Sequence, residues 1–237
     1  KFTDFIIFFC AFLKFDKIKK LLSKLVFKSK LYLYLLKQKV FFKYIEALSL
    51  FMKKQIVIFI SGKGSNALNI INYFSETENL TVTHVYSNNK NSPFFEHKLN
   101  SNIKVSYFQN NDLKTEVFDE LKLIKPDLIV LAGFLKKIPL IYIDYFKKMI
   151  INIHPALLPK YGGKGMYGDH VHKAVVDSNA TESGITIHFV NEKYDEGNII
   201  SQAKCAVLPT DTYKDVASKI HALEYKYFPE VIEKLLF

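Results

Sequence analysis

A chain of 237 residues, 49% of them hydrophobic, is long enough for one sizeable α/β domain with its own core. This hydrophobic content excludes a disordered protein, and no run of about twenty uncharged apolar residues predicts a membrane span. The two cysteines, Cys10 and Cys205, match no disulfide framework or metal-ligand spacing, which favours a reducing, cytoplasmic setting.

The formal net charge of +10 is concentrated at the N-terminal end. Residues 1–51 contain eleven lysines and three acidic residues, so this stretch carries +8 of the total. The remaining chain is nearly neutral. The basic residues are lysines with no arginine, which excludes bidentate guanidinium contacts with phosphate. We therefore expect small molecules, and not nucleic acid, as partners.

Residues 1–51 also lack glycine, proline and methionine, whereas Met52 is followed at once by a β-rich run. Three interpretations are open: a basic amphipathic segment on a membrane surface, a targeting peptide, or a translated upstream stretch outside the working protein. We favour the third, do not expect membrane contact, and assign the domain to residues 52–237.

From Met52 onward, short β-branched or aromatic runs alternate with segments of helical spacing. The first five strands are expected at residues 55–60, 81–87, 104–108, 127–132 and 149–154. The intervening helices are expected at residues 65–74, 92–99, 115–124 and 139–148. This alternation predicts an open, mainly parallel, Rossmann-like α/β sheet with helices on both faces.

The pattern changes after His154. Two longer strands, at residues 183–190 and 198–208, are joined by the turn NEKYDEG, and an amphipathic helix runs from about Thr212 to Leu236. These two strands can fold back over the edge of the parallel sheet.

A glycine-rich turn, SGKGSN, follows the first strand. Its spacing satisfies the loose dinucleotide-binding pattern, but the second strand ends in Ser87 and Asn88 where an acidic ribose ligand is expected. The spacing of a Walker loop is also absent. Backbone amides at a helix N-terminus suit phosphate, yet the glycines could simply form a tight turn, with Ser65 or Asn66 capping the helix. Both interpretations stay open at this point.

The run NIHPALLP ends a buried strand with two polar residues. Because strand side chains alternate faces, Asn152 and His154 point the same way at the carboxyl end of a strand, where open α/β sheets bind ligands. Pro155 restricts the backbone of His154 to extended geometry. An amide and a protonated imidazole can stabilise an oxyanion, although a purely structural pair that closes a loop is the alternative.

An imidazole in such a role needs a carboxylate that orients it and raises its pKa. Asp195, in the turn between the last two strands, is the favoured candidate because that turn can reach the sheet edge. Its neighbour Glu196 is the rival, and the sequence does not separate them.

These segments together resemble the phosphoribosylglycinamide formyltransferase family, folate-dependent enzymes of purine synthesis. The resemblance runs from Met52 to the C-terminus and rests on the motifs ISGKGSN, PDLIVLAGFLKKI, NIHPALLPKY, GITIHFV followed by YDEG, and ALEYKYFPEVI. It implies transfer of a formyl group from 10-formyltetrahydrofolate, the co-substrate, to the amine of 5-phosphoribosylglycinamide. It implies no metal, and we expect a monomer or homodimer.

Site residues follow from the resemblance, position by position. It implies that the catalytic residues are Asn152, His154 and Asp195. It implies that the ribotide contacts are Gly64, Ser65, Asn66, Gly133 and Glu224. It implies that the folate contacts are Lys114, Leu135, Lys136, Lys137, Ile138 and Asn152.

This sequence departs from the family at several points. Lys136 and Lys114 stand where the family has arginines. The stretch YGGKGMYGDHVH is longer than its family counterpart, and we expect a mobile lid leading into a helix capped by Asp169. His170 and His172 within it lack a third ligand at supporting spacing, so a metal site is not expected.

Other functions remain as alternatives. Methionyl-tRNA formyltransferase needs a C-terminal tRNA-binding domain, and this chain ends soon after the shared core. Formyltetrahydrofolate hydrolase lacks the phosphate turn and carries an N-terminal regulatory domain that residues 1–51 do not resemble. A non-catalytic phosphate- or nucleotide-binding module, or a membrane-tethered protein, stays open as a different class.

Overall fold

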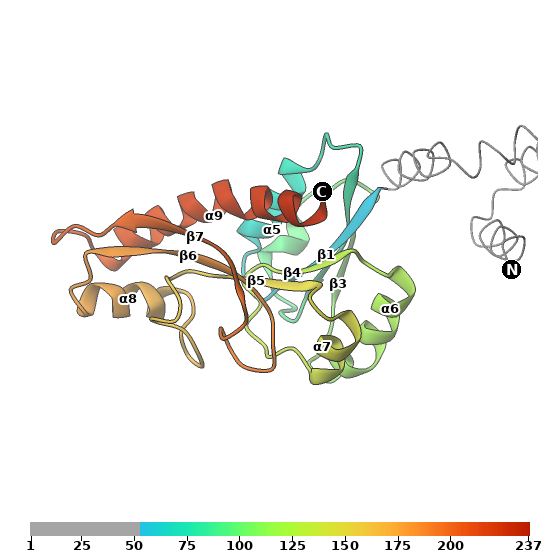
Figure 1. Ribbon diagram of the computed structural model, residues 1–237. Coiled ribbons are helices and arrows are strands. Elements are labelled where there is room, and N and C mark those ends of the chain that lie inside the picture. Colours follow the sequence, from blue (N-terminus) through green and yellow to red (C-terminus); the bar gives the residue numbers. More distant parts are fainter. Residues whose placement is uncertain (1–52) are drawn as a thin grey trace, which may run out of the picture. The chain divides into compact units, whose positions relative to one another are not determined.

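The computed structural model describes residues 53–237, in which the strands form one sheet (Figure 1). The interpretations of residues 1–51 concern residues outside this range. The strands are β1 (Lys54–Ile60), β2 (Leu80–Ser87), β3 (Lys104–Tyr107), β4 (Leu128–Leu131), β5 (Ile150–His154), β6 (Glu182–Phe189) and β7 (Ile199–Ala206). Their order across the sheet is β3-β2-β1-β4-β5-β6-β7.

The helices alternate with the first five strands and close the chain. They are α5 (Ser65–Tyr73), η1 (Pro93–Glu96), η2 (Asp112–Lys114), α6 (Glu116–Ile124), α7 (Leu140–Phe146), α8 (Asp169–Asp177) and α9 (Tyr213–Leu236). The pairs among β1 to β5 are parallel, while β5–β6 and β6–β7 are antiparallel. The expected mainly parallel α/β sheet is confirmed.

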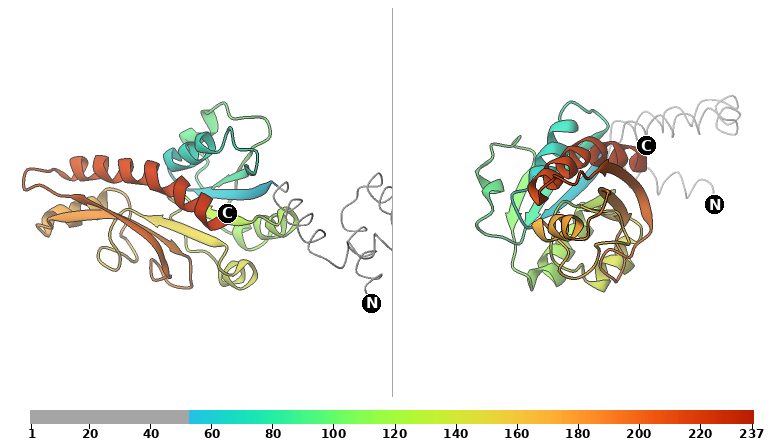
Figure 2. Two further views of the ribbon diagram at one scale, coloured as in Figure 1. Left: turned by 45° about the horizontal axis from the view of Figure 1, so that its top comes forward. Right: turned by 90° about the vertical axis from the view of Figure 1, so that its left-hand side faces the viewer.

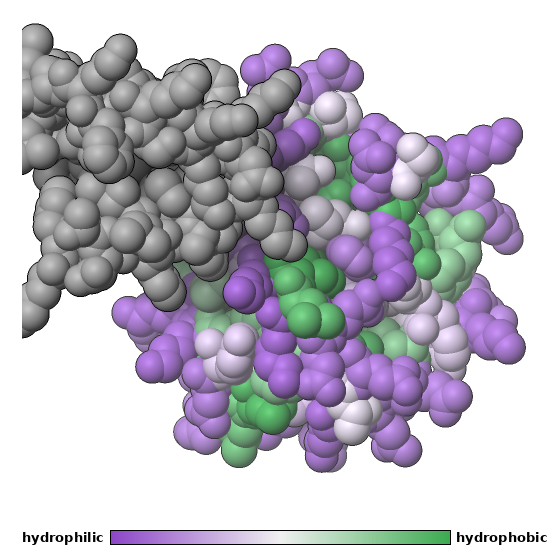
Figure 3. All heavy atoms as spheres, turned by 90° about the vertical axis from the view of Figure 1, so that its right-hand side faces the viewer, coloured by the Kyte–Doolittle hydropathy of each residue, from purple (hydrophilic) through white to green (hydrophobic). Residues whose placement is uncertain are grey.

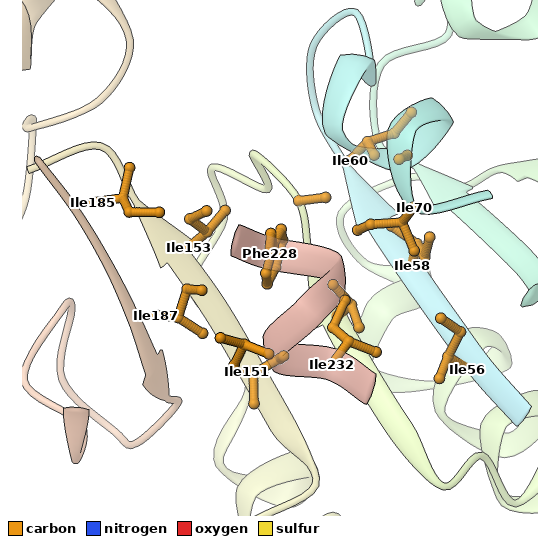
Figure 4. Packing of buried hydrophobic residues seen from close by; sticks show 14 of the residues in the cluster. Ile56, Ile58, Ile60, Ile70, Ile151, Ile153, Ile185, Ile187, Phe228 and Ile232 are labelled. Carbon is orange, nitrogen blue, oxygen red and sulfur yellow. The ribbon is translucent and has the colours of Figure 1, made fainter. Parts of the chain in front are cut away.

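One face of the sheet is covered by α5 and α9, and α8 packs beside α9 (Figure 2). Figure 4 shows isoleucines of β1, β5 and β6 around Phe228 and Ile232 of α9. The opposite face is covered by α6 and α7, against which Val57 and Phe59 of β1 pack. Burial on both faces explains why β1 reads as a continuous apolar run.

The structure corrects two local expectations. The helix expected at residues 92–99 is only the 3-10 turn η1, because His97 already has an extended backbone. Asp169 does not cap α8: it is the first helical residue, Gly168 is the cap position, and no side chain bonds the helix end. Four glycines in residues 162–168 let the chain enter α8 with three left-handed backbone positions.

The surface carries both hydrophilic and hydrophobic side chains. On the face shown in Figure 3, hydrophilic side chains surround separate hydrophobic patches. None of the described helices combines the length and apolarity that crossing a membrane requires.

The packing of α9 on the sheet yields a stability prediction. Phe228 is 0% exposed, so Phe228→Ala leaves a cavity that lowers the free energy of unfolding by about 3–5 kcal/mol. The matched control is Leu123→Ala on α6, where the side chain is 84% exposed and the change stays within about 0.5 kcal/mol. Urea denaturation followed by circular dichroism measures both. Equal losses in the two variants would contradict this account of the core.

Candidate active site

Strand β5 presents its two polar side chains at its carboxyl end. It pairs with β4 on one side and β6 on the other, so Asn152 and His154 sit inside the sheet, where parallel strands meet antiparallel ones. His154 is 3% exposed. Ile151 and Ile153 belong to the apolar core on the α9 face, so the expected alternation of faces is observed.

His154 has an acceptor near each ring nitrogen. Its Nε2 lies 2.8 Å from the carbonyl oxygen of Tyr161, to which it donates. Its Nδ1 lies 3.5 Å from Oδ2 of Asp195, too far for a normal hydrogen bond but close enough for strong electrostatic coupling. Asp195, and not Glu196, is therefore the carboxylate at the histidine. The Glu196 side chain is exposed and pairs with Lys193.

The Asp195 carboxylate accepts a hydrogen bond from the glycine-rich stretch that precedes α8. The amide of Gly163 donates to its Oδ2 at 2.8 Å, and its side chain is 11% exposed. Burial raises the pKa of Asp195, but His188, His154 and the Gly163 amide outweigh burial, so the pKa lies below its ordinary value. The residue is an anion at neutral pH, in a left-handed backbone conformation (φ 57°) that non-glycine residues seldom adopt.

The expected rise in the pKa of His154 is wrong. Burial lowers the pKa of His154, and the opposing influence of Asp195 and of the Tyr161 carbonyl does not outweigh burial. The imidazole is therefore neutral at neutral pH. Because Nε2 donates to Tyr161, the proton of the neutral ring is on Nε2 and the lone pair is on Nδ1.

His188 completes the cluster and was not expected from the sequence. It stands opposite Asn152 in the β5–β6 ladder, and the two side chains are 3.1 Å apart, from Nδ2 to Nε2. Its Nδ1 donates to the carbonyl oxygen of Phe189 at 2.9 Å, so its Nε2 accepts from Asn152. The available signal was the alternation of polar Thr186 and His188 within an apolar strand.

The glycine turn between β1 and α5 leaves backbone amides without side-chain partners. Gly64 occupies the cap position of α5 with a left-handed backbone (φ 71°), and no side chain caps the helix. The capping role considered for Ser65 or Asn66 is therefore wrong: Ser65 is the first helical residue, and Asn66 bonds Glu224 instead. Free amides at this helix end can bind an anion, and Lys63 lines the same space.

One cavity of about 610 Å³ joins the glycine turn to the Asn152–His154–Asp195 cluster. Its walls include every site residue named from the sequence except one: Gly64, Ser65, Asn66, Gly133, Leu135, Lys136, Lys137, Ile138, Asn152, His154, Asp195 and Glu224. Lys114 is exposed on η2 and is not part of this lining. His172 and His221 line the cavity and were also not named as site residues.

Among residues 53–237, no three His, Cys, Asp or Glu side chains form a group that could hold a metal ion.

A sequence profile of the formyl transferase family matches residues 54–232. The chain belongs to the formyl transferase family. It is 39% identical over 188 residues to the chloroplastic phosphoribosylglycinamide formyltransferase of Arabidopsis thaliana, covering 76% of this chain and 64% of that protein. It is 32% identical over 185 residues to the phosphoribosylglycinamide formyltransferase of Escherichia coli, covering 75% of this chain and 84% of that protein.

Solved structures agree with this assignment. Phosphoribosylglycinamide formyltransferase from Anaplasma phagocytophilum superposes with a TM-score of 0.70 at 28% identity, covering 78% of this chain and 87% of that one. Glycinamide ribonucleotide transformylase 1 from Geobacillus kaustophilus superposes with a TM-score of 0.71 at 26% identity, covering 78% of this chain and 100% of that one. The resemblance recognised in the sequence and the fold class are confirmed for this formyl transferase.

The glycine turn yields a matched pair of variants. Gly64→Ala forces a left-handed alanine whose Cβ overlaps the Phe94 ring, so we expect the free energy of unfolding to fall by about 1–3 kcal/mol. In Gly62→Ala the added Cβ lies in open space, so the free energy of unfolding should change by less than about 1 kcal/mol. Chemical denaturation compares the two. A Gly64→Ala protein as stable as Gly62→Ala would contradict the described turn.

Proposed function

We propose that this formyl transferase moves the formyl group of 10-formyltetrahydrofolate onto the amine of 5-phosphoribosylglycinamide, a step of purine biosynthesis. The observation that carries the proposal is the single cavity in which an anion-binding turn and the Asn152–His154–Asp195 cluster face the same space. Its volume of about 610 Å³ lies in the range of small-molecule sites. The names of the relatives support the same reaction.

Two ends of the cavity differ in character, which supports two substrates. The end formed by residues 62–66 offers backbone amides and Lys63 to a phosphate. The end formed by residues 134–138 offers an apolar wall with Lys136 and Lys137, and here the resemblance assigns the folate. The proposed contact of Lys114 with the folate rests on the family resemblance alone.

The folate supplies an activated formyl group, and Asn152 is suited to bind its oxygen. An amide side chain has two N–H donors, and one of them is satisfied by His188 at 3.1 Å. The second is free to donate to the formyl oxygen as negative charge develops there. His188 fixes the rotamer, so this donor is oriented before substrate binds.

His154 is suited to move the proton. When the ribotide amine bonds to the formyl carbon, the neutral imidazole accepts the amine proton at Nδ1, and the resulting cation lies 3.5 Å from the Asp195 carboxylate. The cation then returns the proton to the folate nitrogen as its bond to the formyl carbon breaks. A lowered pKa makes His154 a neutral acceptor at neutral pH, and Asp195 stabilises the charge formed during the step.

The deciding experiment follows the loss of 10-formyltetrahydrofolate by absorbance, with and without 5-phosphoribosylglycinamide. Loss that depends on the ribotide supports transfer. Loss without it would establish hydrolysis, and no loss in either case would leave a binding module; both results would overturn the proposed function.

Two substitutions test the assignment of roles. Asn152→Ala removes the oxyanion donor and His154→Ala removes the proton acceptor, so each should lower kcat by roughly 10²-fold or more. His170→Ala, an exposed histidine outside the cavity, is the control and should keep the wild-type kcat. Steady-state kinetics with circular dichroism separates loss of chemistry from loss of folding. Wild-type turnover in either variant refutes its assigned role.

The pH dependence of kcat distinguishes a neutral from a charged His154. A base must be unprotonated, so kcat should rise with pH through a pKa below about 6.5 and stay level above it. Because the Asp195 carboxylate raises the pKa of His154, Asp195→Asn should move this acid limb to lower pH while lowering kcat. A kcat that falls as pH rises through neutrality would instead show that the cation is the active form.

We also propose that residues 52–237 are the catalytic domain and that residues 1–51 lie outside the working protein. The family match to residues 54–232 supports this division. The proposed oligomeric state is a monomer or a homodimer. The proposed setting is the cytoplasm, on the basis of cysteine usage, with small molecules and no nucleic acid as partners.

A further inference from the structure

Glu224 is a buried carboxylate whose two oxygens have different surroundings. Its side chain is 7% exposed, on the part of α9 that borders the cavity. Oε2 accepts a hydrogen bond from Asn66 Nδ2 at 3.0 Å and faces His221 Nδ1, also at 3.0 Å. One oxygen therefore takes both contacts, from α5 and from α9 itself.

The other oxygen, Oε1, has no hydrogen-bond donor among residues 53–237 and is not fully enclosed by protein. An unpaired carboxylate oxygen that is open to the cavity can accept a hydrogen bond from a bound ligand. The ribotide carries ribose hydroxyls and an amine, which are donors of the required kind.

We propose that His221 is a positioning residue for the ribotide. By holding Oε2 together with Asn66, His221 fixes the rotamer of Glu224 so that Oε1 receives a ribotide donor, and ribotide affinity therefore depends on the charge of His221. This inference rests on the proposed function and extends it to a residue that the resemblance does not assign.

The groups around His221 determine when it is charged. The hydrogen bond to Glu224 raises its pKa, burial lowers it, and the Glu224 and Asp169 charges raise it again, for a net rise. Tyr225 stacks on the imidazole, with ring centroids 6.3 Å apart. His172, facing the pair from α8, is neutral because burial and the neighbouring His221 lower its pKa.

The raised pKa favours the charged form of His221, and within residues 53–237 Glu224 makes no other ion pair. The raised pKa of His221 sets the direction in which ribotide affinity changes with pH. The contribution of the His221 charge to ribotide affinity is complete at pH values below the ordinary histidine pKa. It is lost as the pH rises through the higher pKa that His221 has in the folded protein. The His221 side chain is 54% exposed, so solvent reduces the effect.

The experiment compares KM for 5-phosphoribosylglycinamide in the full-length wild-type protein, His221→Gln and His221→Ala between pH 6 and pH 8.5. Glutamine keeps a donor without a charge, and alanine removes both. We expect His221→Ala to raise KM by roughly tenfold at pH 6 with kcat largely retained, and His221→Gln, which keeps a donor without the charge, to recover only part of that loss.

The ratio of KM in His221→Gln to KM in wild type isolates the charge, because titration of the ribotide is common to both proteins. This ratio should be largest at pH 6 and approach one at pH 8.5. His97→Gln, an exposed histidine outside the cavity, is the matched control and should follow wild type. The KM for 10-formyltetrahydrofolate should not change in any variant.

Three results would overturn the inference: a His221→Ala KM within twofold of wild type, a ratio that does not vary with pH, or kcat and both KM values changing together. Each leaves the proposed function standing if transfer still depends on the ribotide. Absence of ribotide-dependent transfer in the wild-type protein would overturn the proposed function, and this inference with it.

Discussion

The antiparallel pairing of β6 with β5 is the constraint on which the rest of the site depends. It places His188 opposite Asn152 and Thr186 opposite His154. The buried hydroxyl of Thr186 donates to the carbonyl of Ala156 and accepts from the amide of Leu158, which fixes the chain just after β5. A shift of one residue in this pairing would turn every one of these side chains to the other face.

The same pairing sets the direction from which Asp195 approaches. Strands β6 and β7 carry the turn of residues 191–197 back over the sheet edge, where Asp195 adopts its left-handed backbone. Such a conformation costs about 1–3 kcal/mol and persists only when neighbouring contacts fix it. Here the Gly163 amide donates to its carboxylate, so the glycine-rich stretch before α8 and the proposed proton acceptor His154 face one anion.

Burial and charge then distinguish His154, His172 and His221, three of the four histidines that line the cavity. Burial dominates at His154 and His172, which are neutral, whereas the contact with Glu224 dominates at the half-exposed His221. Neutral His154 suits acceptance of a proton, and the raised pKa of His221 favours the charged form that attracts the Glu224 carboxylate. The difference arises from the depth of each ring in the protein and not from residue type.

The amino-acid sequence was sufficient to predict the alternation of strands and helices, because hydrophobic periodicity and turn formers are local properties. It also determined that Asn152 and His154 share a face, since side chains alternate along any strand. The choice of Asp195 over Glu196, the presence of His188 and His221 at the site, and the lowered pKa of His154 emerged from the folded arrangement. Those results depend on strand register and on depth of burial, which arise from contacts between residues far apart in the chain.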